Sequence, residues 1–134
     1  RQNATTLHAL MEAILAPYRD GPNIDISGAD IPIGAGVITN LALLIHEFAT
    51  NATKYGALST RAGRVSISVG EHDTDVIFTW SERGGPPVKR RHKEGFGSLL
   101  VKTTVDGQLG GRASYDWKPE GLVITLSIPK TRLG

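Results

Sequence analysis

The sequence feature that most constrains the fold is the periodic stretch between residues 34 and 56. Its apolar residues recur every three or four positions, as on the buried stripe of an amphipathic helix; they are Leu41, Leu44, Ile45, Phe48 and Ala52. Gly56 stands where a glycine commonly ends a helix. The pattern therefore predicts a long helix from Gly34 to Tyr55 with one buried face.

Polar residues run along one side of this predicted stripe. Glu47 and Asn51 are four positions apart, so they are neighbours on the flank of the helix, and Lys54 continues the row. Carboxylate and amide oxygens one turn apart suit a magnesium ion that also holds phosphate oxygens, because Mg²⁺ in such sites takes only one or two protein oxygens. The alternative is the solvated rim of an amphipathic helix, and this stretch alone does not decide between the two.

Two glycine-bearing segments follow. Residues 80–88 read Trp-Ser-Glu-Arg-Gly-Gly-Pro-Pro-Val after a strand-like run, and residues 95–100 read Gly-Phe-Gly-Ser-Leu-Leu. The second segment opens a helical pattern, and the free backbone amides at a helix start attract phosphate. A Gly-x-Gly before a helix is a weak signal by itself. The order of carboxylate-bearing helix, strand with Glu-x-Gly, basic loop and Gly-x-Gly helix is much more specific.

In these segments the chain resembles the catalytic ATP-binding domain of sensor histidine kinases, in the GHKL superfamily that includes DNA gyrase (the Bergerat fold). Its motifs resemble the HWE subfamily, named for a His in the helix motif and a Trp-x-Glu in the first glycine box; His46, Trp80 and Glu82 stand at those places. The motifs that carry the resemblance are His-Glu-x-x-Thr-Asn-Ala-x-Lys-Tyr-Gly-Ala-Leu-Ser (46–59), Trp-x-Glu-x-Gly-Gly-Pro-Pro-Val (80–88), Gly-Phe-Gly-Ser (95–98) and Leu-Gly-Gly-Arg (109–112). The resemblance covers nearly the whole chain from about residue 5. Phe48, where Leu is usual, and Leu99, where Arg is frequent, depart from the family pattern.

The resemblance implies a domain that binds Mg²⁺ and ATP and donates the γ-phosphoryl group to a histidine on a separate dimerisation domain. We expect that phosphoacceptor domain to be absent from residues 1–134, because His8, His72 and His92 do not resemble an acceptor segment. The implied partners are ATP, the protein's own dimerisation domain and a response regulator, with a homodimer only in the full-length protein. Two alternatives stay open: a serine kinase of the anti-sigma type or an ATPase on the same fold, and a non-catalytic nucleotide-sensing module.

The rest of the chain predicts an α+β fold. Helices are expected over 7–15 and 97–109, and strands over 23–27, 64–69, 76–80, 112–117 and 122–128. The polar residues 70–75 are expected to join two of these strands. Helices on one face of a mixed, mostly antiparallel sheet form a two-layer sandwich, so we expect a single domain of that kind.

The resemblance also implies the site residues. The catalytic residues are expected to be Glu47 and Lys54, the metal ligands Asn51 and Glu47, and the nucleotide-binding residues Asn51, Tyr55, Glu82, Gly84, Gly85, Lys89, Arg91, Gly95, Phe96, Gly97, Ser98 and Leu99. Glu47 would orient or deprotonate a water or act through the metal, and Glu82 would accept a hydrogen bond from the adenine amino group. His46 lies roughly 100° from Glu47 around the helix, so we expect it on the opposite flank, packed and without a catalytic role.

Residues 89–93 form an unbroken row of basic residues, Lys-Arg-Arg-His-Lys. The resemblance implies a short lid whose cations close over the triphosphate. A solvated loop and a docking patch for an acidic partner are the alternatives. Five adjacent residues cannot all point at one ligand, so we expect at most two to touch phosphate.

Composition narrows the function classes. The chain has no Cys, which excludes disulfides and thiolate metal sites. No apolar run approaches the ~20 residues of a membrane span, and a net charge of +2 is too small to indicate nucleic acid by itself. We therefore expect a cytoplasmic domain that contacts neither membrane nor nucleic acid.

Overall fold

The computed structural model describes residues 3–87 and 96–134. Its strands are β1 (Asn3–Thr6), β2 (Ile24–Gly28), β3 (Pro32–Gly34), β4 (Arg64–His72), β5 (Asp75–Arg83), β6 (Arg112–Lys118) and β7 (Gly121–Pro129). Its α-helices are α1 (Leu7–Leu15), α2 (Ala35–Tyr55) and α3 (Phe96–Thr103). No helix in these described ranges is long and apolar enough to span a membrane.

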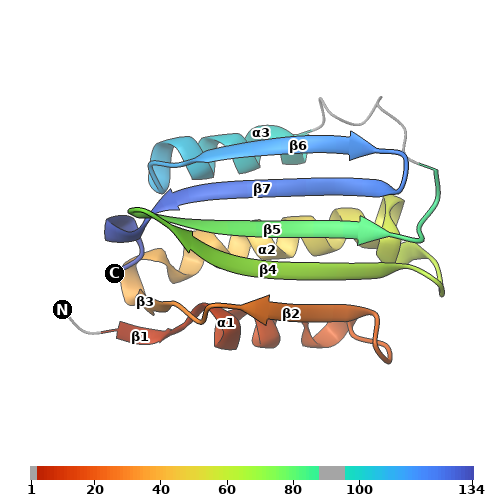
Figure 1. Ribbon diagram of the computed structural model, residues 1–134, viewed down its shortest axis with the longest axis horizontal. Helices are drawn as coiled ribbons and strands as arrows, with labels where there is room; N and C mark the ends of the chain where they lie inside the picture. The colour runs from red at the N-terminus through yellow and green to blue at the C-terminus, as the bar shows by residue number, and fades with distance from the viewer. Residues whose placement is uncertain (1–2, 88–95) are drawn as a thin grey trace.

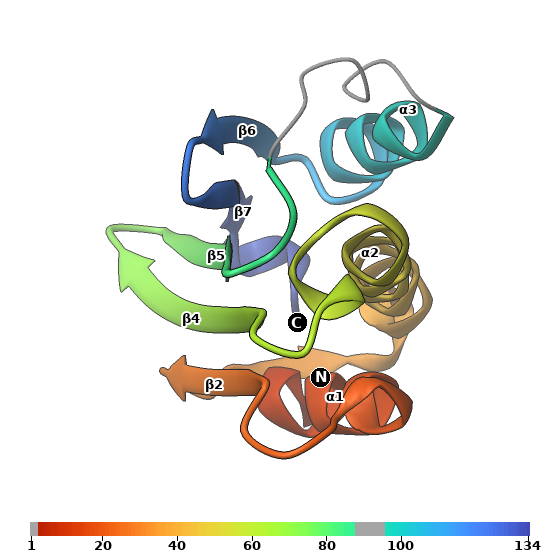
Figure 2. The same ribbon diagram turned by 90° about the vertical axis from the view of Figure 1, so that its right-hand side faces the viewer.

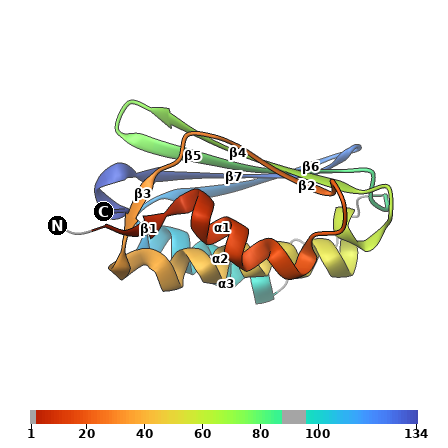
Figure 3. The same cartoon turned by 90° about the horizontal axis from the view of Figure 1, so that it is seen from below.

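The strands form one main sheet in the order β2-β4-β5-β7-β6 (Figure 1). β2 runs parallel to β4, and the other neighbours are antiparallel. β1 and β3 pair separately with each other. All three helices lie against one face of the sheet (Figure 3). The predicted α+β sandwich with a mixed, mostly antiparallel sheet is confirmed.

The core lies between α2 and the inner face of the sheet. Side chains alternate along a strand, and on β5 the inward positions are Val76, Phe78, Trp80 and Glu82. Phe48 of α2 packs against two of them, with ring centroids 6.3 Å from Phe78 and 5.6 Å from Trp80. The five residues of the predicted apolar stripe are all buried, and burying each large apolar side chain contributes about 1.5–3 kcal/mol.

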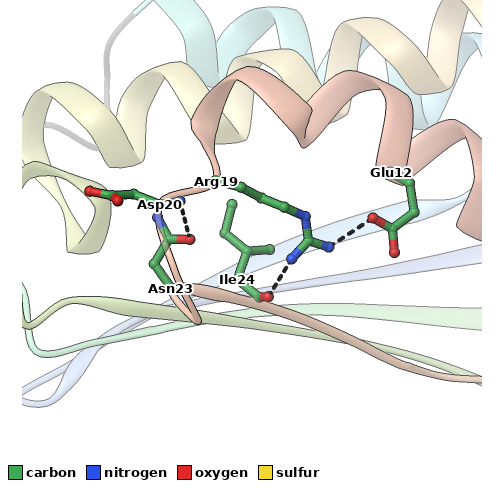
Figure 4. Close-up of polar contacts among 5 residues, drawn as sticks. All are labelled: Glu12, Arg19, Asp20, Asn23 and Ile24. Atoms are coloured by element: carbon green, nitrogen blue, oxygen red, sulfur yellow. Dashed lines mark hydrogen bonds and ion pairs between the residues drawn. The ribbon is translucent and has the colours of Figure 1, made fainter.

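A cluster of polar contacts joins the end of α1 to the start of β2 (Figure 4). The Arg19 guanidinium donates to Glu12 Oε1 at 2.8 Å and to the Ile24 carbonyl at 2.9 Å. Asn23 accepts from the Asp20 amide at 2.9 Å and donates to the Tyr18 carbonyl at 3.0 Å. These hydrogen bonds stabilise the turn that brings the chain from the helix layer to the edge of the sheet.

Several boundaries differ from those predicted. β4 and β5 extend through most of the segment expected to be a loop, and only Asp73-Thr74 separates the hairpin's ends, with Asp73 at φ 55°. The extension was not predicted because residues 70–75 are not apolar on either face of the strands. The alternation of apolar and polar residues that indicates a strand is therefore missing there. The third helix, expected over 97–109, is α3 followed by a π-helical turn at Thr104–Gln108. β1 and β3 were not predicted, since each is only three or four residues long.

Candidate nucleotide site

The second half of α2 carries a linked acid–amide pair on one flank. The Asn51 side-chain nitrogen donates to Glu47 Oε2 at 3.0 Å, and both side chains are half-buried. This bond turns the amide nitrogen toward the carboxylate and therefore turns the amide oxygen away from it. Lys54, on the next turn of the same flank, is exposed. The three residues lie in one row, as their spacing predicted.

This pair fits a hard divalent cation. It offers carboxylate and amide oxygens, which are the ligand types that Mg²⁺ takes. Within the described ranges, no cluster of three or more His, Asp or Glu side chains could hold a metal ion. A cation on this flank would therefore take most of its ligands from phosphate and water, as Mg²⁺ commonly does.

The inner face of the sheet at its β6 edge lies opposite this pair. Tyr115 of β6 is half-buried and stacks on Trp117, with ring centroids 6.1 Å apart. Burial raises the pKa of Tyr115 to about 12, and the negative charge of Glu47 adds to the increase. Sequence reasoning did not single out Tyr115. Its place beside Trp117, at alternating positions of a predicted strand, was the signal that could have found it.

Glu82 lies on β5, and its carboxylate is hydrogen-bonded beside the C-terminal end of α2. Its Oε1 accepts from the backbone amide of Ala57, just after α2, at 3.1 Å, and its Oε2 accepts from the Trp80 indole nitrogen at 2.9 Å. The residue is 7% exposed. Burial raises the pKa of the Glu82 carboxyl, and the hydrogen bonds from Trp80 and Ala57 oppose that increase. The predicted base-reading carboxylate thus lies on a strand and is tied to α2.

The glycines after Glu82 allow a close backbone fit. Gly84 has φ +76°, which L side chains rarely adopt, and its carbonyl accepts from the Thr60 hydroxyl at 2.9 Å. A Cβ on Gly85 would lie 2.8 Å from the Ala57 Cα. Both glycines are therefore required by packing of the 84–85 segment against the segment after α2. Access of a base to the backbone at Gly84 stays a prediction.

The remaining predicted site residues lie at the end of α2, on α3 or outside the described residues. Tyr55 is 55% exposed at the end of α2, and Leu99 is 61% exposed on α3. Phe96, Gly97 and Ser98 form the first turn of α3. Lys89, Arg91 and Gly95, with the whole expected lid, lie outside the described residues.

His46 lies on the opposite flank of α2, as predicted, but it is exposed and not packed. Its ring meets Tyr18 edge-on, with centroids 6.3 Å apart. The expectation of a packed side chain was therefore wrong: despite this ring contact with Tyr18, His46 is exposed. Helical spacing predicts the direction of the side chain, but its exposure depends on which residues of other elements pack beside it.

An apolar pocket also lies between the first half of α2 and the sheet. Leu41, Leu44, Phe48 and Phe78 are among its lining residues, which are all apolar. It offers no polar group to a triphosphate, so it does not compete with the acid–amide pair as a nucleotide site.

No protein-family model matches the chain. Blue-light-activated histidine kinase 1 of Erythrobacter litoralis (strain HTCC2594) is 38% identical over 133 residues, which cover 96% of this chain and 37% of that protein. A blue-light-activated histidine kinase of Brucella anthropi is also 38% identical over 133 residues, covering 95% of this chain and 27% of that protein. The domain is homologous to histidine kinases over nearly its whole length. It spans about a third of the length of these relatives.

Solved structures agree with this assignment at the level of the fold. The histidine kinase domain of the Erythrobacter litoralis EL346 blue-light-activated histidine kinase superposes with a TM-score of 0.74 at 22% identity, covering 95% of this chain and 62% of that one. The catalytic domain of the histidine kinase ThkA, in a nucleotide-free form, gives a TM-score of 0.70 at 18% identity and is covered to 96%. The expected histidine kinase architecture is therefore confirmed.

Proposed function

We propose that this histidine kinase domain binds ATP with Mg²⁺ and donates the γ-phosphoryl group to a histidine on a separate helical dimerisation domain. The observation that carries the proposal is the half-buried Glu47–Asn51 pair, which holds its amide oxygen away from the carboxylate on one flank of α2. The HWE subtype is part of the proposal, and its basis is the His46, Trp80 and Glu82 motif residues.

Each residue has a role that follows from its chemistry and position. Bound Mg²⁺ would neutralise phosphate charge as the phosphoryl group leaves. Asn51 would ligate the metal through its amide oxygen, and Glu47 would act through the metal or orient or deprotonate a water. Lys54 would contact phosphate. Tyr55 would contact the phosphates or the ribose.

Glu82, at the other end of the site from the phosphates, would select the base. A carboxylate only accepts hydrogen bonds, so it pairs with the adenine amino group but meets a carbonyl oxygen in guanine. Glu82 has this chemistry, and each of its oxygens keeps a second lone pair beyond the internal hydrogen bond that it accepts. Glycines 95 and 97 would flank the phosphates, with Lys89 and Arg91 closing over them.

Partners and location belong to the same proposal. One fold relative, ThkA, has been solved in complex with the response regulator TrrA, with a TM-score of 0.70 to this chain. We infer that this domain acts with its own phosphoacceptor domain and a response regulator, in the cytoplasm. The histidine kinase relatives favour this role over an anti-sigma serine kinase or a nucleotide sensor.

The test is transfer of labelled γ-phosphate from ATP. The domain alone should acquire no acid-labile label, because transfer requires an acceptor imidazole roughly 3–3.5 Å from the phosphorus and His46 and His8 lie off the Glu47 flank. Adding the protein's helical phosphoacceptor domain should give label on that domain. Acid-labile label on the 134-residue chain alone, lost in His92→Ala, would show an autonomous kinase and contradict the proposal.

A further inference from the structure

The Trp-x-Glu motif forms a physical unit in the fold. Residues two apart on a strand point to the same face, so Trp80 and Glu82 of β5 both enter the layer between sheet and helices. The Trp80 side chain is fully buried and its indole N–H donates to Glu82 Oε2 at 2.9 Å. An indole has only this one polar atom and it only donates. The packing of Trp80 therefore fixes the direction of a donor toward the carboxylate.

A second contact fixes the other oxygen of the same carboxylate. Oε1 accepts from the Ala57 amide at 3.1 Å, and a Cβ on Gly56 would lie only 2.2 Å from Oε1. The carboxylate plane is thus held from the strand side by an indole and from the helix side by a backbone amide. Figure 2 shows the two segments meeting, with the end of β5 beside the end of α2.

We propose that Trp80 is a positioning residue for base selection: its indole N–H orients the Glu82 carboxylate so that the remaining acceptor lone pairs meet the amino group of adenine. This inference rests on the proposed function. Glu82 is only 7% exposed, so little of its surface is open to a ligand. A carboxylate free to rotate there would present its acceptors in several directions and discriminate less between bases.

The electrostatics of the unit agree with this role. Burial raises the pKa of the Glu82 carboxyl, the hydrogen bonds from Trp80 and Ala57 lower it, and no charged side chain is among the causes. Val65 lies across from it on β4, Gly56 and Ala57 lie beside its carboxylate after α2, and Gly121 lies beside its carbonyl. Removing the indole donor should therefore raise the carboxyl's pKa further.

The experiment compares the affinities of the domain for ATP and GTP by titration calorimetry in wild type, Trp80→Phe and Phe78→Leu. Loss of a hydrogen bond to a charged group corresponds to about a tenfold change, so the ATP preference should fall by about tenfold in Trp80→Phe. Phe78→Leu is the matched control, because it removes aromatic packing from the same face of β5 without touching Glu82. It should lower the melting temperature and leave the ATP preference unchanged.

A pH series separates positioning from packing. The ATP preference of wild type should fall on acidification as Glu82 gains a proton, and in Trp80→Phe that midpoint should move to higher pH. If Trp80→Phe does not fold, Gly56→Ala perturbs the same carboxylate from the Oε1 side, and the ATP preference should fall there too. Gly56 has φ −123°, so the added methyl acts by contact and not by backbone strain.

The outcomes distinguish this inference from the proposed function. If wild type binds no ATP, the proposed function fails. If wild type prefers ATP and folded Trp80→Phe keeps the same preference and the same pH midpoint, Trp80 only fills the core, and the inference is overturned. An unchanged preference in Gly56→Ala would overturn it in the same way.

Discussion

On one flank of α2, His46 and Thr50 lie a turn apart; on the other flank, Glu47 and Asn51 do the same. The first pair lies on the flank that faces the 3-10 turn Ala16–Tyr18 just after α1, hereafter the α1 flank. There Tyr18 meets the His46 ring, and its hydroxyl lies 3.5 Å from the Thr50 hydroxyl. The second pair is joined by its own 3.0 Å hydrogen bond and faces the β6 edge of the sheet. Figure 2 shows α2 between α1 and α3.

The comparison shows that helix spacing alone does not make a site. Both flanks have polar residues at i and i+4, and both are neighbours of the same buried stripe. They differ in what lies opposite. An aromatic ring contacts His46 on its flank, whereas on the other flank the Glu47 carboxylate acts on the half-buried Tyr115, whose pKa its charge helps to raise.

The largest effect should come from the charge on the Glu47 flank. Glu47→Gln keeps the size of the side chain but removes its charge and basicity, and positioned acid–base groups contribute about 10²–10⁴-fold to rates. Phosphotransfer to the added phosphoacceptor domain should fall by about that factor. His46→Gln, the adjacent residue on the other flank, is the matched control and should change the rate by less than about tenfold. Equal losses in the two variants would remove the distinction between the flanks.

The next effect should be on metal-dependent binding. Asn51→Ala removes the amide oxygen that would ligate Mg²⁺ and leaves Glu47 without its hydrogen bond. ATP affinity should weaken by about 1–3 kcal/mol, the usual cost of an unsatisfied polar partner. Thr50→Ala, one residue away on the α1 flank, should bind as wild type does. Calorimetry with and without Mg²⁺ checks both, and unchanged, metal-independent affinity in Asn51→Ala would contradict the assignment.

Local periodicity predicted α2 correctly because it depends on neighbours within one turn. It gave the helix, its apolar stripe and the row of Glu47, Asn51 and Lys54. It could not give the partners of Glu82, because the Ala57 amide lies 25 positions away in sequence and meets the carboxylate only in the folded chain. Tyr115 did have a local signal, its place two residues before Trp117 on a predicted strand, but its interaction with Glu47 arises only in the folded chain. The exposure of His46 also depends on tertiary packing, and there the sequence-based expectation was wrong.

A smaller effect should appear in the titration of Tyr115. Its pKa of about 12 is raised first by burial and then by Glu47, so Glu47→Gln should lower that pKa by less than half of the shift. The raised pKa favours the neutral phenol in the folded state. Its contribution to stability is therefore complete below the unfolded value of about 10 and is lost as the pH rises toward about 12.

Phenolate absorbance measures this titration directly. The chain has three tyrosines, so subtraction of the Tyr115→Phe curve isolates the signal. His46→Gln is again the control and should leave the Tyr115 midpoint in place. A midpoint that does not respond to Glu47→Gln would mean that the carboxylate does not face the β6 edge, and the comparison between the flanks would lose its structural basis.

The smallest effect should be the loss of the polar contact on the α1 flank. The Tyr18 and Thr50 hydroxyls lie 3.5 Å apart, at the outer limit for a hydrogen bond between hydroxyls, and both side chains are only part-buried. Water can therefore replace the contact, and Tyr18→Phe should change the free energy of unfolding by less than about 0.5 kcal/mol. Tyr18→Ala also removes the ring that meets His46 and should cost more. Urea denaturation of both variants measures the difference. A large loss in Tyr18→Phe would show that the α1 flank is held by polar contacts after all, and that the two sides of α2 differ less than their geometry indicates.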